Sequence, residues 1–280
     1  MDNRIALQLN SGDGSGCHRV YRYPARFPSS VARWAIERFT RAGDTVYDPF
    51  MGSGTTALEA VMLERHAVGC DVNPFAVWLT RTKLALPNAA AISSLYRAWL
   101  DRWGFQVGTW HSAWNAQWYD PSDYQRLCGL RRAADCPVTQ LLFLRVARAM
   151  AHMNPRSGKV CRARAPQTRE LHAELDRQCR LLLARLRDWQ PLPPRAQRRA
   201  ALIWADACTV DYPPVERPQL VVTSPPYLNA YDYLAWCRLE IEWLAAHAYY
   251  DHARRLAVMP RTPELAWERI AQALHSAWDT

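Results

Sequence analysis

The hydrophobic pattern of the N-terminal part alternates between short β-favouring runs and helical spacings. Residues 45–48 and 67–71 have the composition of strands. A helix is expected after each of them, from residue 55 to about residue 65 and over residues 73–84. This alternation predicts a doubly wound, mostly parallel α/β sheet of the Rossmann-like type.

A helix is also predicted ahead of the first strand, over residues 28–39, with Ser29 or Ser30 as its N-cap. Residues at helical spacing there are Val31, Trp34, Ala35 and Arg38. Gly43 and Asp44 are expected to end it. Residues 1–17, with the sequence SGDGSG and little hydrophobic pattern, are predicted to be a mobile leader.

The pattern changes between residues 87 and 199, where long helical spacings rich in Trp, Arg and Ala are interrupted at residues 154–159. This segment is predicted to be a helical insertion in the sheet. Strand signals return at residues 201–204 and 219–223, the second a continuous apolar run typical of a strand buried on both faces. A helix is expected over residues 232–247.

The composition of the 280-residue chain is that of a folded protein, because 49% of its residues are hydrophobic. Its formal net charge is +9, and its only lysines are Lys83 and Lys159, so nearly all the positive charge is guanidinium. Either a GC-rich coding bias or a surface that binds a polyanion explains this choice of residue.

The eight cysteines include no Cys-x-x-Cys pair, and the N-terminus has no apolar run like that of a signal peptide. No apolar stretch is long enough to span a membrane. The sequence therefore predicts a reduced, cytoplasmic protein with no membrane partner, and no metal cofactor is expected.

The first strand is followed by the loop Asp-Pro-Phe-Met-Gly-Ser-Gly, which enters a helix at Thr55. Glycines such as Gly52 and Gly54 let a ligand approach the backbone closely. Asp71, at the end of the next strand, can accept both hydroxyl groups of a ribose. The spacing matches neither a dinucleotide fingerprint nor a Walker phosphate loop, so an adenosine cofactor or a purely structural turn remains.

The segment Thr-Ser-Pro-Pro-Tyr follows the apolar run at residues 219–223, at the strand edge where open α/β sheets bind ligands. The Ser224 hydroxyl and the Pro225 carbonyl can accept the two hydrogens of a planar amine, and Pro226 holds the turn rigid. Tyr227 can stack on a base. The alternative is a proline-rich turn without chemistry.

The two motifs together resemble the DNA amino-methyltransferase family, whose hallmark pair is Phe-x-Gly-x-Gly and Ser/Asn/Asp-Pro-Pro-Tyr. They are present here as residues 50–54 and 224–227. The resemblance extends to residues 18–28, similar to the family segment that covers the methionine end of the cofactor. It implies methyl transfer from S-adenosylmethionine to an exocyclic amino group of a DNA base, with cytosine N4 favoured over adenine N6.

The resemblance also implies roles for single residues. Asp48 would contact the methionine amino group, and Asp206 is placed like the acidic residue near the cofactor adenine. The cofactor-binding residues expected by this comparison are Phe27, Asp48, Phe50, Gly52, Gly54, Thr55, Asp71 and Asp206. No Pro-Cys dipeptide occurs, which argues against C5-cytosine methylation.

The chain is accordingly divided into a leader (1–17), a cofactor-binding half (18–86), the helical insertion (87–199) and a catalytic half (200–280). Residues 126–199 contain 17 Arg and Lys against 5 Asp and Glu, which favours contact with DNA phosphates. The arginines expected there are Arg131, Arg132, Arg162, Arg164 and Arg198. Four aromatic residues could stack on bases or belong to the core: Trp110, Trp114, Trp118 and Tyr119.

Only 53 residues follow Tyr227, and one helix and a weak strand at residues 255–259 are predicted there. Three alternatives follow: a reading frame truncated at the C-terminus, a fold completed by a second polypeptide, or a compact variant. The alternatives to an active DNA methylase are an inactive remnant that binds DNA or a partner, and a methyltransferase of RNA or of protein glutamine. A restriction endonuclease is a partner that the resemblance suggests.

Overall fold

The computed structural model describes residues 16–26, 28–110, 112–154, 161–163, 169–207, 217–226 and 232–245. Within these residues, four parallel strands form one sheet in the order β3-β2-β1-β4. The strands are β1 (Thr45–Asp48), β2 (His66–Asp71), β3 (Ala200–Trp204) and β4 (Leu220–Val221). The predicted parallel α/β fold is confirmed.

The strand order reverses direction between β1 and β4. The chain steps outward from β1 to β2 and β3, then returns to place β4 on the opposite side of β1. In parallel α/β sheets, such a reversal leaves a crevice outside the carboxyl ends of the two strands, where ligands bind. The loops after Asp48 and after Val221 therefore meet at this point.

Three helices accompany the first strands: α1 (Ser29–Phe39), α2 (Thr55–Met62) and α3 (Pro74–Leu84). The α3 helix begins as predicted, because the Asn73 side chain accepts a hydrogen bond from the backbone N–H of Phe75 and Pro74 takes the first helical position. The predicted N-cap of α1 is wrong: Pro28 occupies that position, and no side chain caps the helix.

Other boundaries also differ from the sequence-based expectation. The β4 strand covers only two residues, and Leu220 and Val221 are half-buried because β4 lies at the edge of the described sheet. The expected burial on both faces is therefore wrong. The helix predicted at residues 232–247 is two short helices, α10 (Tyr233–Trp236) and α11 (Arg238–Trp243), which meet at Cys237.

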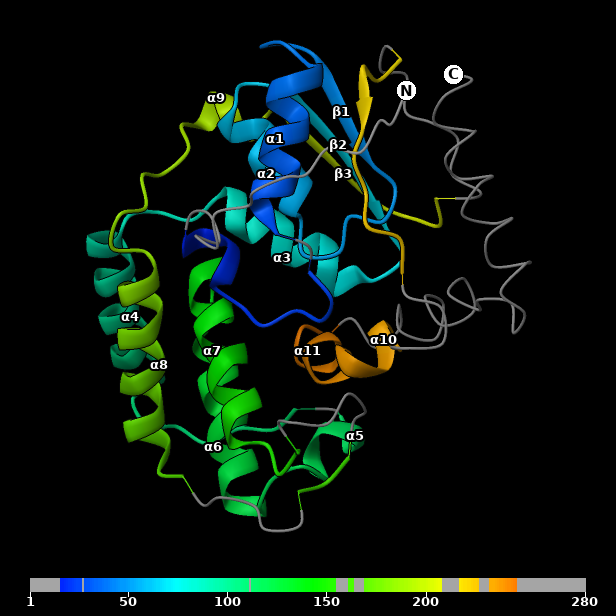
Figure 1. Cartoon of the computed structure of the whole chain (residues 1–280). Coiled ribbons are helices and arrows are strands. Elements are labelled where there is room, and N and C mark those ends of the chain that lie inside the picture. Colours follow the sequence, from blue (N-terminus) through cyan, green and yellow to red (C-terminus); the bar gives the residue numbers. More distant parts are fainter. Residues whose placement is uncertain are drawn as a thin grey trace.

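The segment between β2 and β3 continues from α3 into six helices, which Figure 1 shows mostly below the sheet, except α9 near its upper edge. They are α4 (Ala89–Trp103), α5 (Ala113–Ala116), α6 (Pro121–Ala133), α7 (Pro137–Met150), α8 (Leu171–Arg185) and α9 (Pro194–Gln197). Here α7 packs against α8, and α4 packs against α6, α7 and α8. The predicted helical character of this segment is confirmed.

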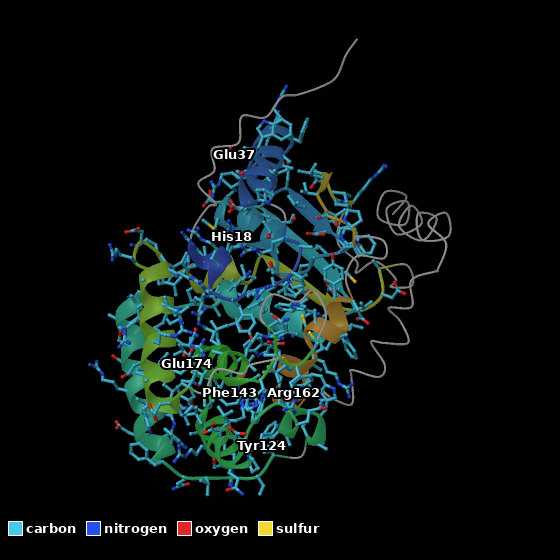
Figure 2. All side chains as sticks on the ribbon, turned by 60° about the horizontal axis from the view of Figure 1, so that its bottom comes forward. His18, Glu37, Tyr124, Phe143, Arg162 and Glu174 are labelled. Carbon is cyan, nitrogen blue, oxygen red and sulfur yellow. The ribbon has the colours of Figure 1, made fainter. Side chains whose placement is uncertain are left out.

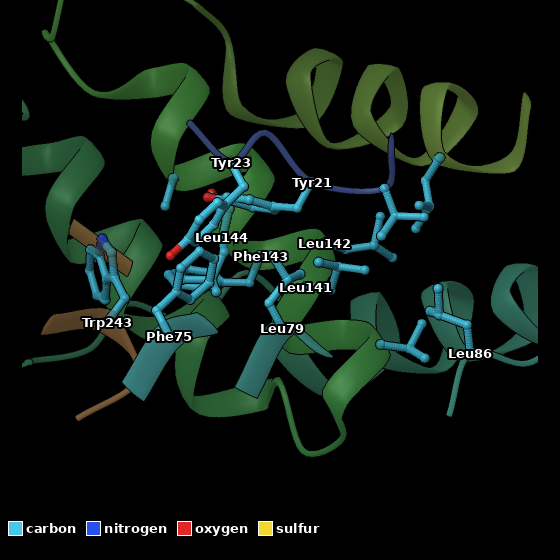
Figure 3. Close-up of a cluster of buried hydrophobic side chains, with 14 of the residues drawn as sticks. Tyr21, Tyr23, Phe75, Leu79, Leu86, Leu141, Leu142, Phe143, Leu144 and Trp243 are labelled. Carbon is cyan, nitrogen blue, oxygen red and sulfur yellow. The ribbon is translucent and has the colours of Figure 1, made fainter. Parts of the chain in front are cut away.

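One hydrophobic core joins the helical segment to the sheet. Figure 3 shows Tyr21 of the N-terminal segment among side chains of α3 and α7, with Phe75 and Phe143 beside Trp243 of α11. Phe143 and Trp243 meet edge to face, with ring centroids 5.0 Å apart. The helices are therefore packed into the same body as the sheet.

A buried ion pair reinforces this junction. The Arg148 guanidinium of α7 forms a two-point ion pair with Glu240 of α11 and lies 4.3 Å from the centroid of the Trp236 ring. The Tyr21 hydroxyl donates to the same carboxylate at 2.6 Å. Three distant parts of the chain thus meet at the Glu240 carboxylate. Removing Arg148 would leave this buried negative charge without a cation to balance it.

Several predictions concern residues that the structure does not describe. They include most of the mobile leader, Phe27, Arg164, Tyr227 and the strand at residues 255–259. In the described part of the chain, no helix is both long and apolar enough to cross a membrane.

Gly54→Ala tests the packing of the glycine loop on α3. Gly54 has a φ of 77°, and an added Cβ would lie 2.3 Å from the Thr80 side chain. We expect a loss of unfolding free energy of about 2 to 4 kcal/mol, measured by denaturant unfolding. Gly43→Ala is the matched control, because Gly43 has a φ of 89° and nothing within 4 Å of the added Cβ. Equal losses in both variants would contradict the packing argument.

Candidate functional site

Three carboxylates line up along the carboxyl edge of the sheet. Asp48 ends β1, Asp71 ends β2, and Asp206 follows β3 by two residues. Asp48 and Asp206 are buried, and Asp71 is half-buried. Because parallel strands bring their ends to one edge, residues 158 positions apart in the chain form a single acidic row.

Both oxygens of Asp71 hold the backbone of neighbouring loops. Oδ2 accepts from the Gly52 N–H at 2.7 Å, and Oδ1 accepts from the Asn73 N–H at 2.8 Å. A carboxylate has about four lone-pair directions, so it can accept further hydrogen bonds. Tyr23 covers this place: its hydroxyl accepts from the Asn73 amide at 3.3 Å, and its ring lies 3.4 Å from where a Gly52 Cβ would be.

Asp48 connects the glycine loop to β4. Its Oδ1 accepts from the Phe50 N–H at 3.1 Å and from the Thr223 hydroxyl at 2.6 Å. The Thr56 hydroxyl, at the start of α2, donates to the Val222 carbonyl at 3.2 Å. The loop after β1 and the segment after β4 are therefore bonded to each other at the strand reversal.

Burial raises the pKa values of the two carboxyl groups at the glycine loop. The pKa of Asp48 is raised to about 6 despite hydrogen bonds from Thr223, Thr56 and Phe50, and that of Asp71 is also raised to about 6. Within the described residues neither forms a salt bridge. Near neutral pH the site therefore carries negative charge that a bound cation would compensate.

The predicted catalytic segment begins directly after Thr223, whose hydroxyl donates to Asp48. Ser224, Pro225 and Pro226 follow Thr223 and are half-buried at the carboxyl edge. Tyr227 lies outside the described residues, as does Phe27. The structure brings the first three of these residues next to the glycine loop, as the two sequence motifs suggested.

The remaining predicted cofactor residues surround the same edge. Phe50 is half-buried against the small cluster that contains Tyr47, and Gly52 has a φ of 52° in the turn held by Asp71. Gly54 precedes α2, and Thr55 is buried as its first residue. Burial raises the pKa of the Cys70 thiol to about 12, and the nearby Asp71 and Asp206 carboxylates add to this shift. Among the described residues, no group of three or more side chains could hold a metal ion.

The predicted DNA-contacting arginines differ in their surroundings. Arg131 donates from Nε to the Trp243 carbonyl at 2.7 Å and lies 5.1 Å from the centroid of the Trp110 ring. These contacts give it a structural role between α6 and α11. Arg132 and Arg198 are exposed, and the exposed Arg162, labelled in Figure 2, donates to the Gln117 carbonyl.

The four candidate base-stacking aromatics belong to the core or pack against it. Trp118 and Tyr119 are buried, and Trp110 and Trp114 are half-buried against the same cluster. Tyr119 accepts a hydrogen bond from the Trp243 indole at 3.1 Å. The interpretation of these residues as core is therefore favoured over base stacking.

Four residues of the site were not singled out by the sequence analysis: Tyr23, Thr56, Asn73 and Thr223. Asn73 has a visible signal, since an Asn-Pro pair after an acidic strand end is typical of a capped helix. Thr223 was quoted only as part of its motif. Its partner Asp48 is 175 positions away, so no local pattern reports the bond between them.

Comparison with known proteins places the similarity in the N-terminal part. Residues 6–81 match the family model described as DNA methylase. The Type II methyltransferase M.BsoBI of Geobacillus stearothermophilus is 38% identical over 73 residues, 26% of this chain and 14% of that protein. The Type II methyltransferase M.MjaI of Methanocaldococcus jannaschii is 39% identical over 62 residues, 22% of this chain and 20% of that protein.

The matched region thus spans a fifth or less of these two relatives. Among solved structures, the rRNA methyltransferase AviRa of Streptomyces viridochromogenes aligns with a TM-score of 0.34 and 17% identity. That alignment covers 81% of this chain and 71% of the other.

Asp48→Asn is expected to stabilise the protein most at neutral pH. The pKa of Asp48 is raised from 3.8 to about 6 in the folded state, so ionisation opposes folding and stability falls as pH rises between these values. The variant should therefore gain about 1 kcal/mol of unfolding free energy relative to the wild type between about pH 5 and pH 7.5. Denaturant unfolding at both pH values measures the gain, and a pH-independent difference would contradict the burial argument.

Proposed function

We propose that the chain is a member of the DNA amino-methyltransferase family and that it transfers a methyl group from S-adenosylmethionine to an exocyclic amino group of a DNA base. One observation carries the proposal: the hydrogen bond of 2.6 Å between Thr223 and Asp48. It joins the glycine loop, which suits a cofactor, to the Ser-Pro-Pro segment, which suits an amine. A site for each reactant thus lies at one strand reversal.

The residues present fit this cofactor. S-adenosylmethionine carries a sulfonium and an ammonium group, and neither the buried Asp48 nor the half-buried Asp71 forms a salt bridge within the described residues. Asp71 retains lone pairs that can accept ribose hydroxyls, and Gly52 lets the ligand approach the backbone. Asp48 is only 1% exposed, so it attracts the cofactor by its charge from beneath the loop. When bound, S-adenosylmethionine supplies a methyl group on a positively charged sulfur.

The protein side chains would act on the target amine. The Ser224 hydroxyl and the Pro225 carbonyl accept its two hydrogens, which draws the nitrogen toward a tetrahedral and more nucleophilic geometry. Tyr227 stacks on the base and fixes its orientation. Because the target nitrogen is paired inside duplex DNA, the base must leave the helix to reach the site. Positioning is then the main source of rate.

Cytosine N4 is the favoured target, and adenine N6 is the alternative. The preference rests on Ser224 in the sequence Thr-Ser-Pro-Pro-Tyr, since the family more often pairs this form with cytosine and an aspartate with adenine. DNA is favoured over protein because the helical segment is basic, with 17 Arg and Lys against 5 Asp and Glu in residues 126–199. Exposed arginines such as Arg132 and Arg198 are the proposed phosphate contacts.

The direct test is transfer of labelled methyl from S-adenosylmethionine to unmethylated genomic DNA, followed by mass spectrometry of the nucleosides. We expect N4-methylcytosine. N6-methyladenine would keep the mechanism and contradict the choice of base. If the protein binds the cofactor but labels total RNA and not DNA, the substrate class is wrong.

Two variants should separate cofactor binding from transfer. Asp71→Ala removes the proposed ribose acceptor and should weaken cofactor affinity by about tenfold to a hundredfold, as measured by calorimetry. Tyr227→Ala should lower the transfer rate by at least about tenfold while cofactor affinity stays within about twofold. Asp101→Ala, at an exposed position of α4, is the control. Unchanged methylation in Tyr227→Ala would show that the site is misassigned.

A further inference from the structure

Lys83, on the last turn of α3, is fully buried with an exposure of 0%. Its Nζ donates to the Ser53 carbonyl at 2.7 Å, in the centre of the glycine loop. Lysine is almost never fully buried without a paired charge, because its desolvation is costly. A residue that only filled space here would be apolar, so the contact with the loop requires an explanation.

Polar groups of the N-terminal segment surround this lysine. The Cys17 thiol donates to the Lys83 carbonyl at 3.5 Å, and His18 is bonded to Glu59 of α2 at 2.7 Å. Glu59 also forms an ion pair with Arg33 of α1 at 2.8 Å, and Arg26 donates to the His18 carbonyl. In Figure 2, His18 lies between α1, which carries Glu37, and the helical segment that carries Glu174.

Among the described residues, no carboxylate forms a salt bridge with Lys83. Glu59 is shared by His18 and Arg33, and burial raises the pKa of the Cys17 thiol to about 12, so the thiol is neutral near pH 7. Burial also lowers the pKa of His18, so Arg26 is the other cation beside Lys83. The Ser53 carbonyl is the acceptor toward which the ammonium points.

The loop is held from α3 at two consecutive turns. Thr80 packs so closely on Gly54 that no side chain fits there, and Lys83 binds the carbonyl one residue earlier. The Gly52 N–H on the other side of the turn is held by Asp71. The conformation of the turn therefore depends on two hydrogen bonds, one from Lys83 to the Ser53 carbonyl and one from the Gly52 N–H to Asp71.

We infer that Lys83 is a positioning residue of the cofactor loop, which holds the Ser53 carbonyl from behind so that the glycine turn is preorganised for S-adenosylmethionine. This inference rests on the proposed function. Binding to a preformed loop costs less ordering entropy, so loss of the donor should weaken affinity without a contact to the ligand.

Lys83→Met removes the donor and keeps an unbranched side chain that is one heavy atom shorter. The Ser53 carbonyl would stay buried without its partner, and we expect the dissociation constant of S-adenosylmethionine to rise about tenfold. Leu84→Met is the matched control, because Leu84 is the next residue of α3, is 4% exposed and tolerates a swap of similar volume. It should leave the affinity within about twofold. Equal affinity of Lys83→Met and the wild type, or equal loss in both variants, would overturn the inference.

The pH dependence distinguishes positioning from general stabilisation. Burial lowers the pKa of Lys83 from 10.5 to about 7, so the unfolded chain binds more protons between these values, and this group makes stability rise with pH. Cofactor affinity should instead fall between about pH 7 and pH 9, as the ammonium loses its proton and its bond to Ser53 weakens. Lys83→Met should remove both trends. A wild-type affinity that does not fall over this range would contradict the inference.

Amide hydrogen exchange gives a readout that does not depend on the cofactor. The free Lys83→Met protein should exchange faster than the wild type over residues 51–57, and Leu84→Met should not. If the wild type fails to bind S-adenosylmethionine yet shows this difference, the proposed function fails while the positioning role of Lys83 stands. Unchanged exchange in this segment would overturn the positioning role itself.

Discussion

The hydrogen bond from Thr223 to Asp48 is the constraint on which the site depends. It crosses the point where strand order reverses and ties the end of β4 to the end of β1. Asp48 also accepts a hydrogen bond from the Phe50 N–H, so the same carboxylate holds the start of the glycine loop. Burial raises the pKa of this group, which makes it costly to the fold at neutral pH. Buried groups with shifted pKa values are enriched at functional sites, which fits the proposed role of Asp48 beside a cationic ligand.

The helical segment is built into this site and is not appended to it. Arg148 of α7 shares Glu240 with Tyr21, and Trp243 packs on Phe143 of the same helix. Tyr23, two residues beyond Tyr21, covers the glycine turn beside Asp71. The N-terminal segment therefore contacts the helical core through Tyr21 and the proposed cofactor site through Tyr23.

Sequence patterns predicted those features that local chemistry determines. The strands at Asp48 and Asp71 and the glycine loop each follow from residues within a few positions of one another. Features that depend on distant partners were not predictable. Arg131 looks like a surface cation in the sequence, yet the Trp243 carbonyl, 112 positions away, holds it between helices. No local pattern reports the burial of Lys83, because its partner, the Ser53 carbonyl, is 30 positions away. The short, half-buried β4 was mistaken for a central strand because its apolar composition does not reveal its edge position.

The hydrogen bond between Thr223 and Asp48 is proposed to hold the glycine loop against the Ser-Pro-Pro segment. A double-mutant cycle on the rate of methyl transfer tests it, with Asp48→Asn, Thr223→Val and the double variant compared at one pH. If the two side chains act through their shared bond, the double variant will be no slower than the slower single variant, a coupling of about 1 kcal/mol or more. Rate losses that multiply independently would contradict the claim.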